Sequence, residues 1–225
     1  MGFFITFEGV EGCGKTTQIR NLSERLTDTG YRTLLTREPG GCPIADKIRS
    51  ILLDADNQGM VPLTELLLYA AARAQHVAEV IVPALESDAI VLCDRFTDAT
   101  IAYQHCGRGI SRPTIDALNS LACQSVRPDL TILMDCDVAI GLARAKNRIE
   151  TSSGPREERF ELEARAFHQR VRDGYLQLAA DEAGRFLKVS ASGTIDEISG
   201  RITAQVLERL TRKQDKDSVC RLPRS

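Results

Sequence analysis

The stretch that decides the fold is Gly9-Val10-Glu11-Gly12-Cys13-Gly14-Lys15-Thr16. An apolar run over residues 3–7 precedes it and predicts a buried strand, and a helix-forming segment begins after it at Thr17. Glycines in such a turn let successive backbone N–H groups face a phosphate, and the N-terminus of the following helix adds partial positive charge. The order of strand, glycine-rich turn and helix therefore predicts a phosphate-binding loop.

Two side chains at the end of this loop complete the expected chemistry. Lys15 is long enough to reach the β- and γ-phosphates of a nucleoside triphosphate, and the hydroxyl of Thr16 can coordinate Mg²⁺. We therefore expect these phosphates to be bound by Gly9, Val10, Glu11, Gly12, Cys13, Gly14, Lys15, Thr16 and Thr17.

The composition favours one α/β domain that handles a small nucleotide. With 225 residues, 43% of them hydrophobic, the chain can bury one well-filled core but not a second full domain. The net charge of −2 argues against a protein that coats nucleic acid. No apolar run approaches the roughly 20 residues that cross a bilayer, and no signal peptide is visible. Seven cysteines without a C-x-x-C pair fit a reducing compartment, so we expect a cytoplasmic enzyme without nucleic-acid or membrane partners.

Five short apolar runs alternate with helical patterns along the chain. The runs predict strands over 3–7, 32–36, 89–93, 130–134 and 186–189, and the patterns predict helices over 18–26, 43–53, 63–82, 111–123, 138–148, 157–183 and from 194 to about 210. This alternation predicts a five-stranded parallel sheet flanked by helices on both faces, with right-handed crossovers. We expect a single domain over 1–210 and a disordered polar tail over 211–225.

Charged residues follow the second and third apolar runs, at the sheet edge where open α/β proteins bind ligands. The run 32–36 leads into 37–41, which reads Arg-Glu-Pro-Gly-Gly, and the run 89–93 leads into Asp94 and Arg95. Asp94 can serve Mg²⁺ and Arg95 can hold a second phosphate group, or both residues only cap the next element. Arg73, inside the helix 63–82, also has an alternative as a surface side chain that keeps its charge in water.

Basic residues surround a turn-forming segment late in the chain. Residues 149–155 are rich in Ser, Thr, Gly and Pro, and five cations flank them: Arg144, Lys146, Arg148, Arg156 and Arg159. The pattern predicts a lid over about 148–159 that closes on phosphate, and the alternative is a solvated charged face.

Together these motifs resemble those of the bacterial thymidylate kinases. The guanine-reading Asn-Lys-x-Asp of GTPases is missing from the sequence. The resemblance spans the chain to about Leu210 and is carried by 7–17, by Thr36-Arg37-Glu38-Pro39-Gly40-Gly41, by Ala71-Ala72-Arg73, by Asp94-Arg95-Phe96, by Ala102-Tyr103-Gln104, by Gly107-Arg108-Gly109 and by Arg159-Phe160-Glu161. The loop alone is generic, whereas the ordered set is specific.

The resemblance implies transfer of the γ-phosphoryl group of ATP to dTMP with Mg²⁺, in a P-loop nucleoside monophosphate kinase fold. It implies that Lys15 stabilises the moving group, that Thr16 and Asp94 organise the metal, and that Arg95 holds the dTMP phosphate. Glu11 would bind the deoxyribose 3′-hydroxyl, Tyr69 would stack on thymine and Arg73 would read a thymine carbonyl. The rest of the dTMP pocket would come from Arg37, Glu38, Pro39, Thr100, Tyr103 and Gln104, with Tyr103 where a 2′-hydroxyl would clash. A homodimer through the helix 63–82 is also implied.

Some members of this family carry a catalytic arginine in the loop, and others carry it in the lid. The loop here offers none, so the chain resembles the lid-arginine type. Arg148 is the first candidate, Arg144 is assigned to ATP, and Lys146, Arg156 and Arg159 remain alternatives with Arg144. Two other functions stay open: a kinase for another pyrimidine nucleotide or a deoxynucleoside, and a non-catalytic ATP-binding regulatory module.

Overall fold

The five apolar runs form the strands of one parallel sheet. They are β1 (Phe3–Glu8), β2 (Thr33–Arg37), β3 (Ile90–Asp94), β4 (Leu130–Asp135) and β5 (Phe186–Ser190), in the order β2-β3-β1-β4-β5. Every neighbouring pair is parallel. The structure is a computed structural model that describes residues 2–151 and 159–220, without the side chains of 148, 150, 151 and 214–220. The predicted five-stranded parallel sheet is confirmed, with β1 at its centre.

The helices follow the predicted order. They are α1 (Lys15–Asp28), α2 (Pro43–Leu53), α3 (Pro62–His76), α4 (Val82–Glu86), α5 (Thr97–Thr100), α6 (Arg112–Cys123), α7 (Val138–Thr151), α8 (Arg165–Asp181) and α9 (Ile195–Cys220). A π-helical segment, Val77–Ile81, joins α3 to α4, so the expected helix 63–82 is one run that extends to Glu86. A second π-helical segment, Ile101–Gly107, continues α5. Such segments often accompany functional sites, and this one carries Tyr103 and Gln104.

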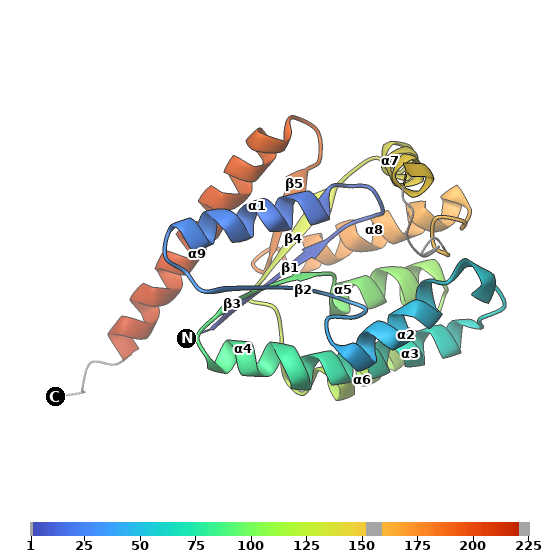
Figure 1. The fold of residues 1–225 in the computed structure, drawn as a ribbon, viewed down its shortest axis with the longest axis horizontal. Coiled ribbons are helices and arrows are strands. Elements are labelled where there is room, and N and C mark those ends of the chain that lie inside the picture. The colour runs from blue at the N-terminus through green and yellow to red at the C-terminus, as the bar shows by residue number, and fades with distance from the viewer. Residues whose placement is uncertain (1, 152–158, 221–225) are drawn as a thin grey trace.

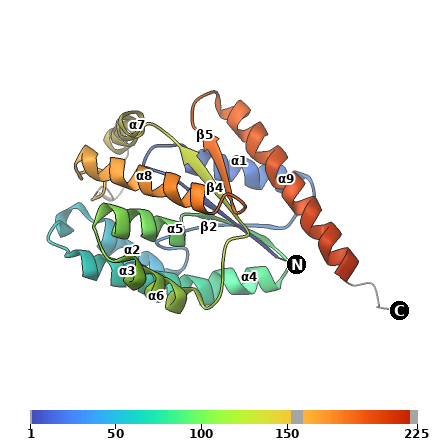
Figure 2. The same ribbon diagram turned by 180° about the vertical axis from the view of Figure 1, so that it is seen from behind.

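Alternate residues of the central strands face opposite layers of helices. Ile5 and Leu92 share a buried cluster with Leu22 of α1, whereas Phe4 and Val91 share another with Ile81. Helices α1 and α9 cover one face of the sheet, and α8, α6 and the α3–α4 run cover the other (Figures 1 and 2). None of the helices in the described ranges is long and apolar enough to span a membrane.

The start of α8 differs from the prediction of a helix from residue 157. Residues 159–164 form turns, and α8 begins at Arg165. The Arg159 N–H donates to the Leu53 carbonyl at 3.3 Å, and the buried Phe160 ring anchors the turn. These tertiary contacts fix a non-helical backbone in a segment whose composition favours a helix.

The end of α9 also differs from the prediction. The helix continues past Leu210 to Cys220, where the sequence predicted a disordered tail from residue 211, and 221–225 lie outside the described residues. Lys213 Nζ donates to Asp129 Oδ1 at 2.9 Å and to the Gly2 carbonyl at 3.0 Å. These two hydrogen bonds hold the extended end of α9 against the rest of the domain. Of the expected lid over 148–159, residues 152–158 are likewise outside the description.

Candidate active site

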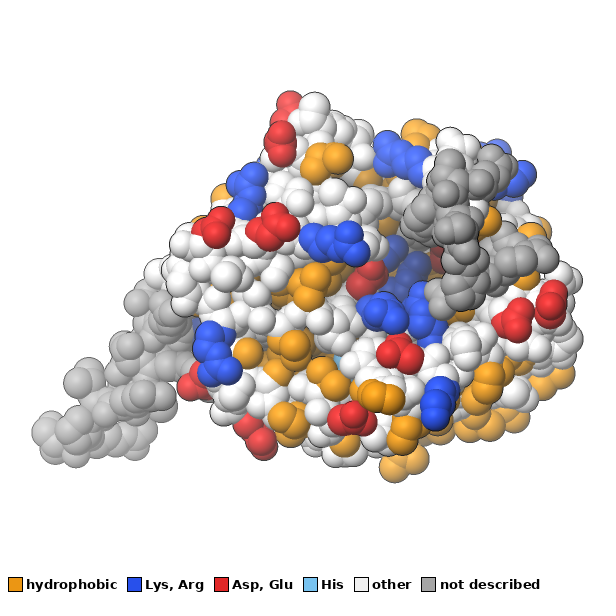
Figure 3. All heavy atoms as spheres, in the orientation of Figure 1, with side chains coloured by type: hydrophobic (Ala, Val, Ile, Leu, Met, Phe, Trp, Pro, Cys, Tyr) orange, Lys and Arg blue, Asp and Glu red, His pale blue; other side chains and the backbone are white. Residues whose placement is uncertain are grey.

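A pocket of about 1110 Å³ opens where β1, β2 and β3 end. Figure 3 shows Lys and Arg side chains gathered around this hollow. Most residues that the sequence assigned to a substrate or metal line it: Glu11, Gly12, Cys13, Gly14, Lys15, Thr16, Thr17, Arg37, Glu38, Pro39, Tyr69, Arg73, Asp94, Arg95, Thr100, Tyr103, Gln104 and Arg144. The sequence analysis did not single out Arg20 and Arg49, which add two cations to the wall.

The glycines of the loop 9–16 permit two close backbone approaches. Gly12 has a φ of 66°, and a Cβ on it would lie 2.0 Å from the carbonyl oxygen of Gly141 in α7. Gly9 has a φ of 139°, and a Cβ there would lie 2.5 Å from the Met134 carbonyl oxygen. Gly9 and Val10 therefore support the loop from behind, while its later residues face the pocket.

The side chains of Lys15, Thr16 and Asp94 lie close to the phosphate loop. Lys15 Nζ donates to the carbonyls of Gly9 and Val10, each at 3.0 Å, inside the curve of the loop. Thr16 Oγ1 donates to Asp94 Oδ2 at 3.1 Å, although 78 positions separate the two residues. The end of β3 thus brings a carboxylate to the hydroxyl that opens α1.

Glu11 is the most densely contacted carboxylate of the pocket. Oε1 accepts from Arg95 Nη2 at 3.2 Å and from the hydroxyl of Tyr103, and Oε2 lies 3.1 Å from His168 Nδ1. Burial alone would raise the pKa of Glu11, but the hydrogen bond with His168, the charge of Arg95 and the bond from Tyr103 outweigh it and lower the pKa to about 2. Glu11 is therefore a carboxylate at any working pH.

Arg95 has a left-handed backbone conformation that glycine usually adopts. Its φ is 70°, and its guanidinium lies 4.8 Å from the centre of the Tyr103 ring. Nη1 donates to the Tyr175 hydroxyl at 3.1 Å. A left-handed backbone in a side-chain-bearing residue is costly, and such strain concentrates at functional sites. The guanidinium is thereby held over the pocket.

Glu8, at the end of β1, is a buried residue that the sequence analysis missed. Oε1 accepts from the Phe96 N–H and Oε2 from the Tyr175 hydroxyl, both at 2.7 Å. Burial first, and then repulsion from Asp98, raises the pKa of Glu8 to about 8. The available signal was a carboxylate placed directly before Gly9 in an otherwise apolar strand.

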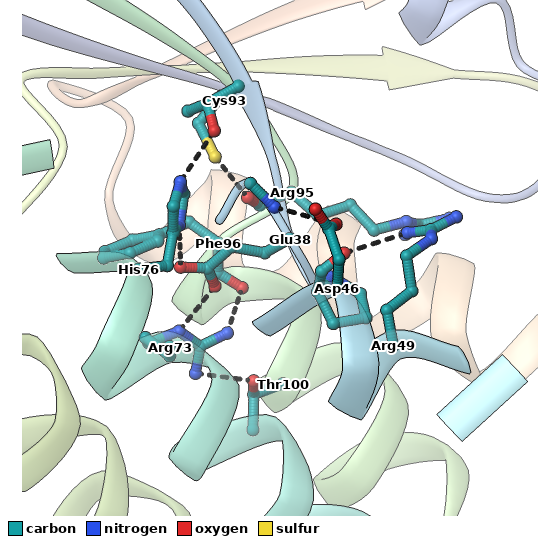
Figure 4. A network of polar contacts seen from close by, with 12 residues as sticks. Glu38, Asp46, Arg49, Arg73, His76, Cys93, Arg95, Phe96 and Thr100 are labelled. Carbon is teal, nitrogen blue, oxygen red and sulfur yellow. Dashed lines mark hydrogen bonds and ion pairs between the residues drawn. The ribbon is translucent and has the colours of Figure 1, made fainter. Parts of the chain in front are cut away.

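Arg73 lies at the centre of a buried polar network (Figure 4). The alternative of a surface side chain is excluded, because Arg73 is only 2% exposed. Nε donates to Glu38 Oε2 at 2.7 Å, and Glu38 Oε1 lies 3.0 Å from His76 Nδ1. Further acceptors for the guanidinium come from three elements: Thr100 Oγ1, Asn119 Oδ1 and the Phe96 carbonyl. The network unites the end of β2, α3 and the segment after β3.

The five cations around residues 149–155 differ in what they face. Arg144 lines the pocket. Arg159 is 5% exposed, and its Nη1 pairs with Glu65 Oε2 at 2.7 Å, so its guanidinium faces a buried carboxylate. Lys146 is exposed, whereas Arg156 and the side chain of Arg148 lie outside the described residues.

Tyr69 and Gln104 line another wall of the pocket. The amide of Gln104 donates to Glu65 Oε1 at 2.8 Å, which fixes its orientation. The ring centre of Tyr69 lies 6.5 Å from that of Phe160. At the rim, Arg37 Nη2 pairs with Asp46 Oδ1 at 3.0 Å.

In the described part of the chain, no group of three or more His, Cys, Asp or Glu side chains could hold a metal ion. A hydroxyl and one carboxylate, Thr16 and Asp94, are the oxygen ligands offered beside the loop. Mg²⁺ characteristically takes one or two protein ligands and completes its shell with phosphates and water. The donor set fits that ion.

The chain is similar to proteins of one family. The family model described as thymidylate kinase matches residues 7–202. The thymidylate kinase of Pelobacter propionicus is 67% identical over 208 residues, which cover 92% of this chain and 95% of that protein. That of Geobacter sulfurreducens is 58% identical over 213 residues and covers 95% and 100%. The crystal structure of thymidylate kinase from Ehrlichia chaffeensis superposes with a TM-score of 0.73 at 34% identity, covering 92% and 98%.

Proposed function

Because the chain belongs to the thymidylate kinase family, we propose how the residues of its pocket divide the work between ATP and dTMP. The enzyme is a P-loop nucleoside monophosphate kinase that phosphorylates dTMP to dTDP in an ATP-dependent reaction. One observation carries the division of roles. Glu11 of the phosphate loop pairs with Arg95 at the end of β3, with Oε1 and Nη2 3.2 Å apart, so loop and acceptor residues meet in one pocket.

The donor half is the loop from Gly9 to Thr17 with Arg144. Its backbone N–H groups bind the phosphates, and Lys15 leaves the loop carbonyls to stabilise charge on the moving phosphoryl group. Thr16 and Asp94 would hold Mg²⁺, which neutralises charge on the phosphate oxygens when bound. Lys15 then acts on the ATP side of the transferred phosphoryl group, and Arg95 acts on the dTMP side. Positioning and charge stabilisation account for most of the catalysis in such reactions.

The acceptor half surrounds dTMP. Arg95 binds the phosphate through two parallel, charge-assisted hydrogen bonds, and Glu11 accepts a hydrogen bond from the 3′-hydroxyl. Tyr103 packs against the sugar and Tyr69 against thymine, whose edge meets Arg73, Thr100 and Gln104. The rim is completed by Arg37, Glu38 and Pro39. This assignment is supported by the convergence of these side chains on one pocket.

Arg148 is our candidate for the catalytic lid cation. Arg144, one turn earlier in α7, lines the pocket, and α7 is braced against the loop at Gly141. Arg159 is a weaker candidate because it is paired with Glu65. We propose a single kinase domain over 1–210, with a lid over about 148–159.

We also propose a homodimer through α2 and α3. Four large apolar side chains on these helices are about half exposed: Ile44, Ile51, Leu63 and Leu67. Figure 3 shows hydrophobic side chains gathered along the edge of the molecule where Figure 1 has these helices. Exposed apolar patches of this kind mark interaction surfaces, and a two-fold dimer uses the same patch twice.

A cytoplasmic location is supported by the free cysteines among the described residues: Cys13, Cys42, Cys93, Cys106, Cys123 and Cys136.

An acceptor panel tests the proposed roles. Initial rates with ATP and Mg²⁺ are measured for dTMP, dUMP, dCMP, UMP and thymidine, with Lys15→Ala as the inactive control. We expect dTMP to be strongly preferred and UMP to be rejected by Tyr103. Faster turnover of thymidine, or Lys15→Ala activity equal to that of the unaltered enzyme, would overturn the assignment.

A further inference from the structure

His168 is a fully buried histidine of α8 whose polar contact lies in the pocket. Its exposure is 0%, and Nδ1 lies 3.1 Å from Glu11 Oε2, across 157 positions of sequence. Its other nitrogen, Nε2, is buried and has no hydrogen-bond partner among the residues that the structure describes. Within that part of the chain, the polar chemistry of this imidazole is therefore directed at Glu11.

The direction of this hydrogen bond follows from the state of Glu11. An ionised carboxylate only accepts hydrogen bonds, so Nδ1 must carry the proton. His168 thus offers Glu11 one N–H donor.

Packing alone does not account for a histidine here. The ring lies at 90° to that of the neighbouring Phe167, with ring centres 5.5 Å apart, and Val171, later on the same helix, is also buried. An apolar side chain would fill such a space without leaving a buried nitrogen unpaired. The N–H group that histidine can donate to Glu11 is what distinguishes it from leucine or phenylalanine at this position.

Counting acceptor sites shows what the contact determines. A carboxylate offers about four lone-pair sites over its two oxygens. Oε1 of Glu11 takes Arg95 and Tyr103, whereas Oε2 takes His168. A further donor is therefore best received at Oε2, beside His168.

We propose that His168 is a positioning residue for dTMP: its Nδ1–H fixes Glu11 Oε2 so that the remaining lone pair faces the acceptor's 3′-hydroxyl. This inference rests on the proposed contact between Glu11 and that hydroxyl. His168 touches no substrate in this scheme, and it acts through Glu11. It would therefore improve recognition of the hydroxyl without improving recognition of the rest of dTMP.

A comparison of dTMP with 3′-deoxy-dTMP isolates this effect. Steady-state kcat and KM are measured for both acceptors with the unaltered enzyme, His168→Leu, His168→Asn and Glu11→Gln. Leucine and asparagine have the same branched shape, but only asparagine carries an N–H near the Nδ1 position. Val171→Ala, another buried change on α8 without contact to Glu11, is the packing control, and melting temperatures are recorded for all variants.

We expect His168→Leu to lose about tenfold in kcat/KM for dTMP, mostly through KM, and to change less than about twofold for 3′-deoxy-dTMP. His168→Asn should recover most of the loss, and Val171→Ala should affect both acceptors equally. If His168→Leu does not fold, His168→Phe takes its place, since it fills more of the ring's volume.

Equal losses with both acceptors in the apolar variant would overturn the inference, since they indicate a structural role. If Glu11→Gln discriminates between the acceptors and the His168 variants do not, only the role of His168 fails. If Glu11→Gln does not discriminate, the contact between Glu11 and the hydroxyl fails, and the inference falls with it.

Discussion

At the scale of single residues, the pocket depends on buried charges that satisfy one another. Glu38 pairs with Arg73 on one oxygen and with His76 on the other, and Glu11 does the same with Arg95 and His168. Each carboxylate therefore orients a cation on a different side of the pocket. Removing one member of such a group leaves the others buried without compensation.

Arg73→Met tests the first of these groups. It should destabilise the protein by about 3–5 kcal/mol, because Glu38 loses its buried counter-charge, and it should raise the KM for dTMP. Urea unfolding and steady-state kinetics provide the two measurements. Adding Glu38→Gln should restore part of the stability but not the KM. A single variant as stable as the unaltered protein would contradict the argument.

Glu8 should give the protein a characteristic dependence of stability on pH. Its pKa rises from 4.5 in the unfolded chain to about 8 in the fold, so between these values the folded protein holds a proton that the unfolded chain has released. The stability from this group is fully present below pH 4.5 and is lost as the pH rises through about 8. Glu8→Gln does not titrate. The free energy of unfolding of the unaltered protein, relative to this variant, should therefore fall across that range in urea titrations; parallel curves would refute it.

At this scale, sequence reasoning found residues that belong to local motifs and missed residues that act across long separations. Thr16 and Asp94 were paired in advance, because both follow parallel strands whose carboxyl ends share an edge. His168 was not assigned, since nothing near it in the chain identifies Glu11 as its partner. His76 and Asn119 were missed for the same reason: their partners are set by how helices pack, which a local pattern does not encode.

At the scale of elements, the backbones of the phosphate loop and α7 approach each other closely. A Cβ on Gly12 would meet the Gly141 carbonyl, and a Cβ on Gly141 would lie 2.4 Å from the Glu11 carbonyl oxygen. The backbone of the helix that carries Arg144 therefore packs directly against the phosphate loop. No known motif covers Gly141, so its role was not expected.

Gly141→Ala should weaken ATP binding and cost about 1–3 kcal/mol, because backbone atoms must separate to admit the methyl group. Gly200→Ala is the matched control on α9. A Cβ there meets nothing within 4 Å, so alanine should stabilise the helix by about 0.5–1 kcal/mol and leave the KM for ATP unchanged. Thermal unfolding and the KM for ATP distinguish the two. If the KM for ATP is unchanged in Gly141→Ala, then α7 does not determine the conformation of the phosphate loop.

Most elements could be predicted from periodicity, whereas the helical segment over 97–107, the start of α8 and the end of α9 could not. The strand runs matched because buried parallel strands are continuously apolar. The start of α8 depends on contacts of Arg159 with Leu53, and the extension of α9 depends on the tie of Lys213 to Asp129. Both are tertiary interactions that override local preference, and neither leaves a trace in the neighbouring sequence.

At the scale of the whole molecule, α2 and α3, which carry exposed apolar side chains, lie on the opposite side of the molecule from α9 (Figures 1 and 2). Leu67→Glu, at a side chain that is 49% exposed, should convert the proposed dimer to monomers in sedimentation at micromolar concentration. Ile195→Glu, which adds the same charge at a 56% exposed position on α9, should leave the dimer intact. A Leu67→Glu variant that sediments like the unaltered protein would refute this interface.

The central place of β1 has a consequence for how the protein is made. Residues 3–8 are synthesised before both strands that pair with theirs, which are β3 at 90–94 and β4 at 130–135. Until β4 has been synthesised, β1 lacks at least one neighbour, and the loop that follows it has no support from Met134 or Gly141. Nascent chains shorter than this should expose an apolar strand that a chaperone can bind, and affinity for ATP should appear late in translation, in a single step.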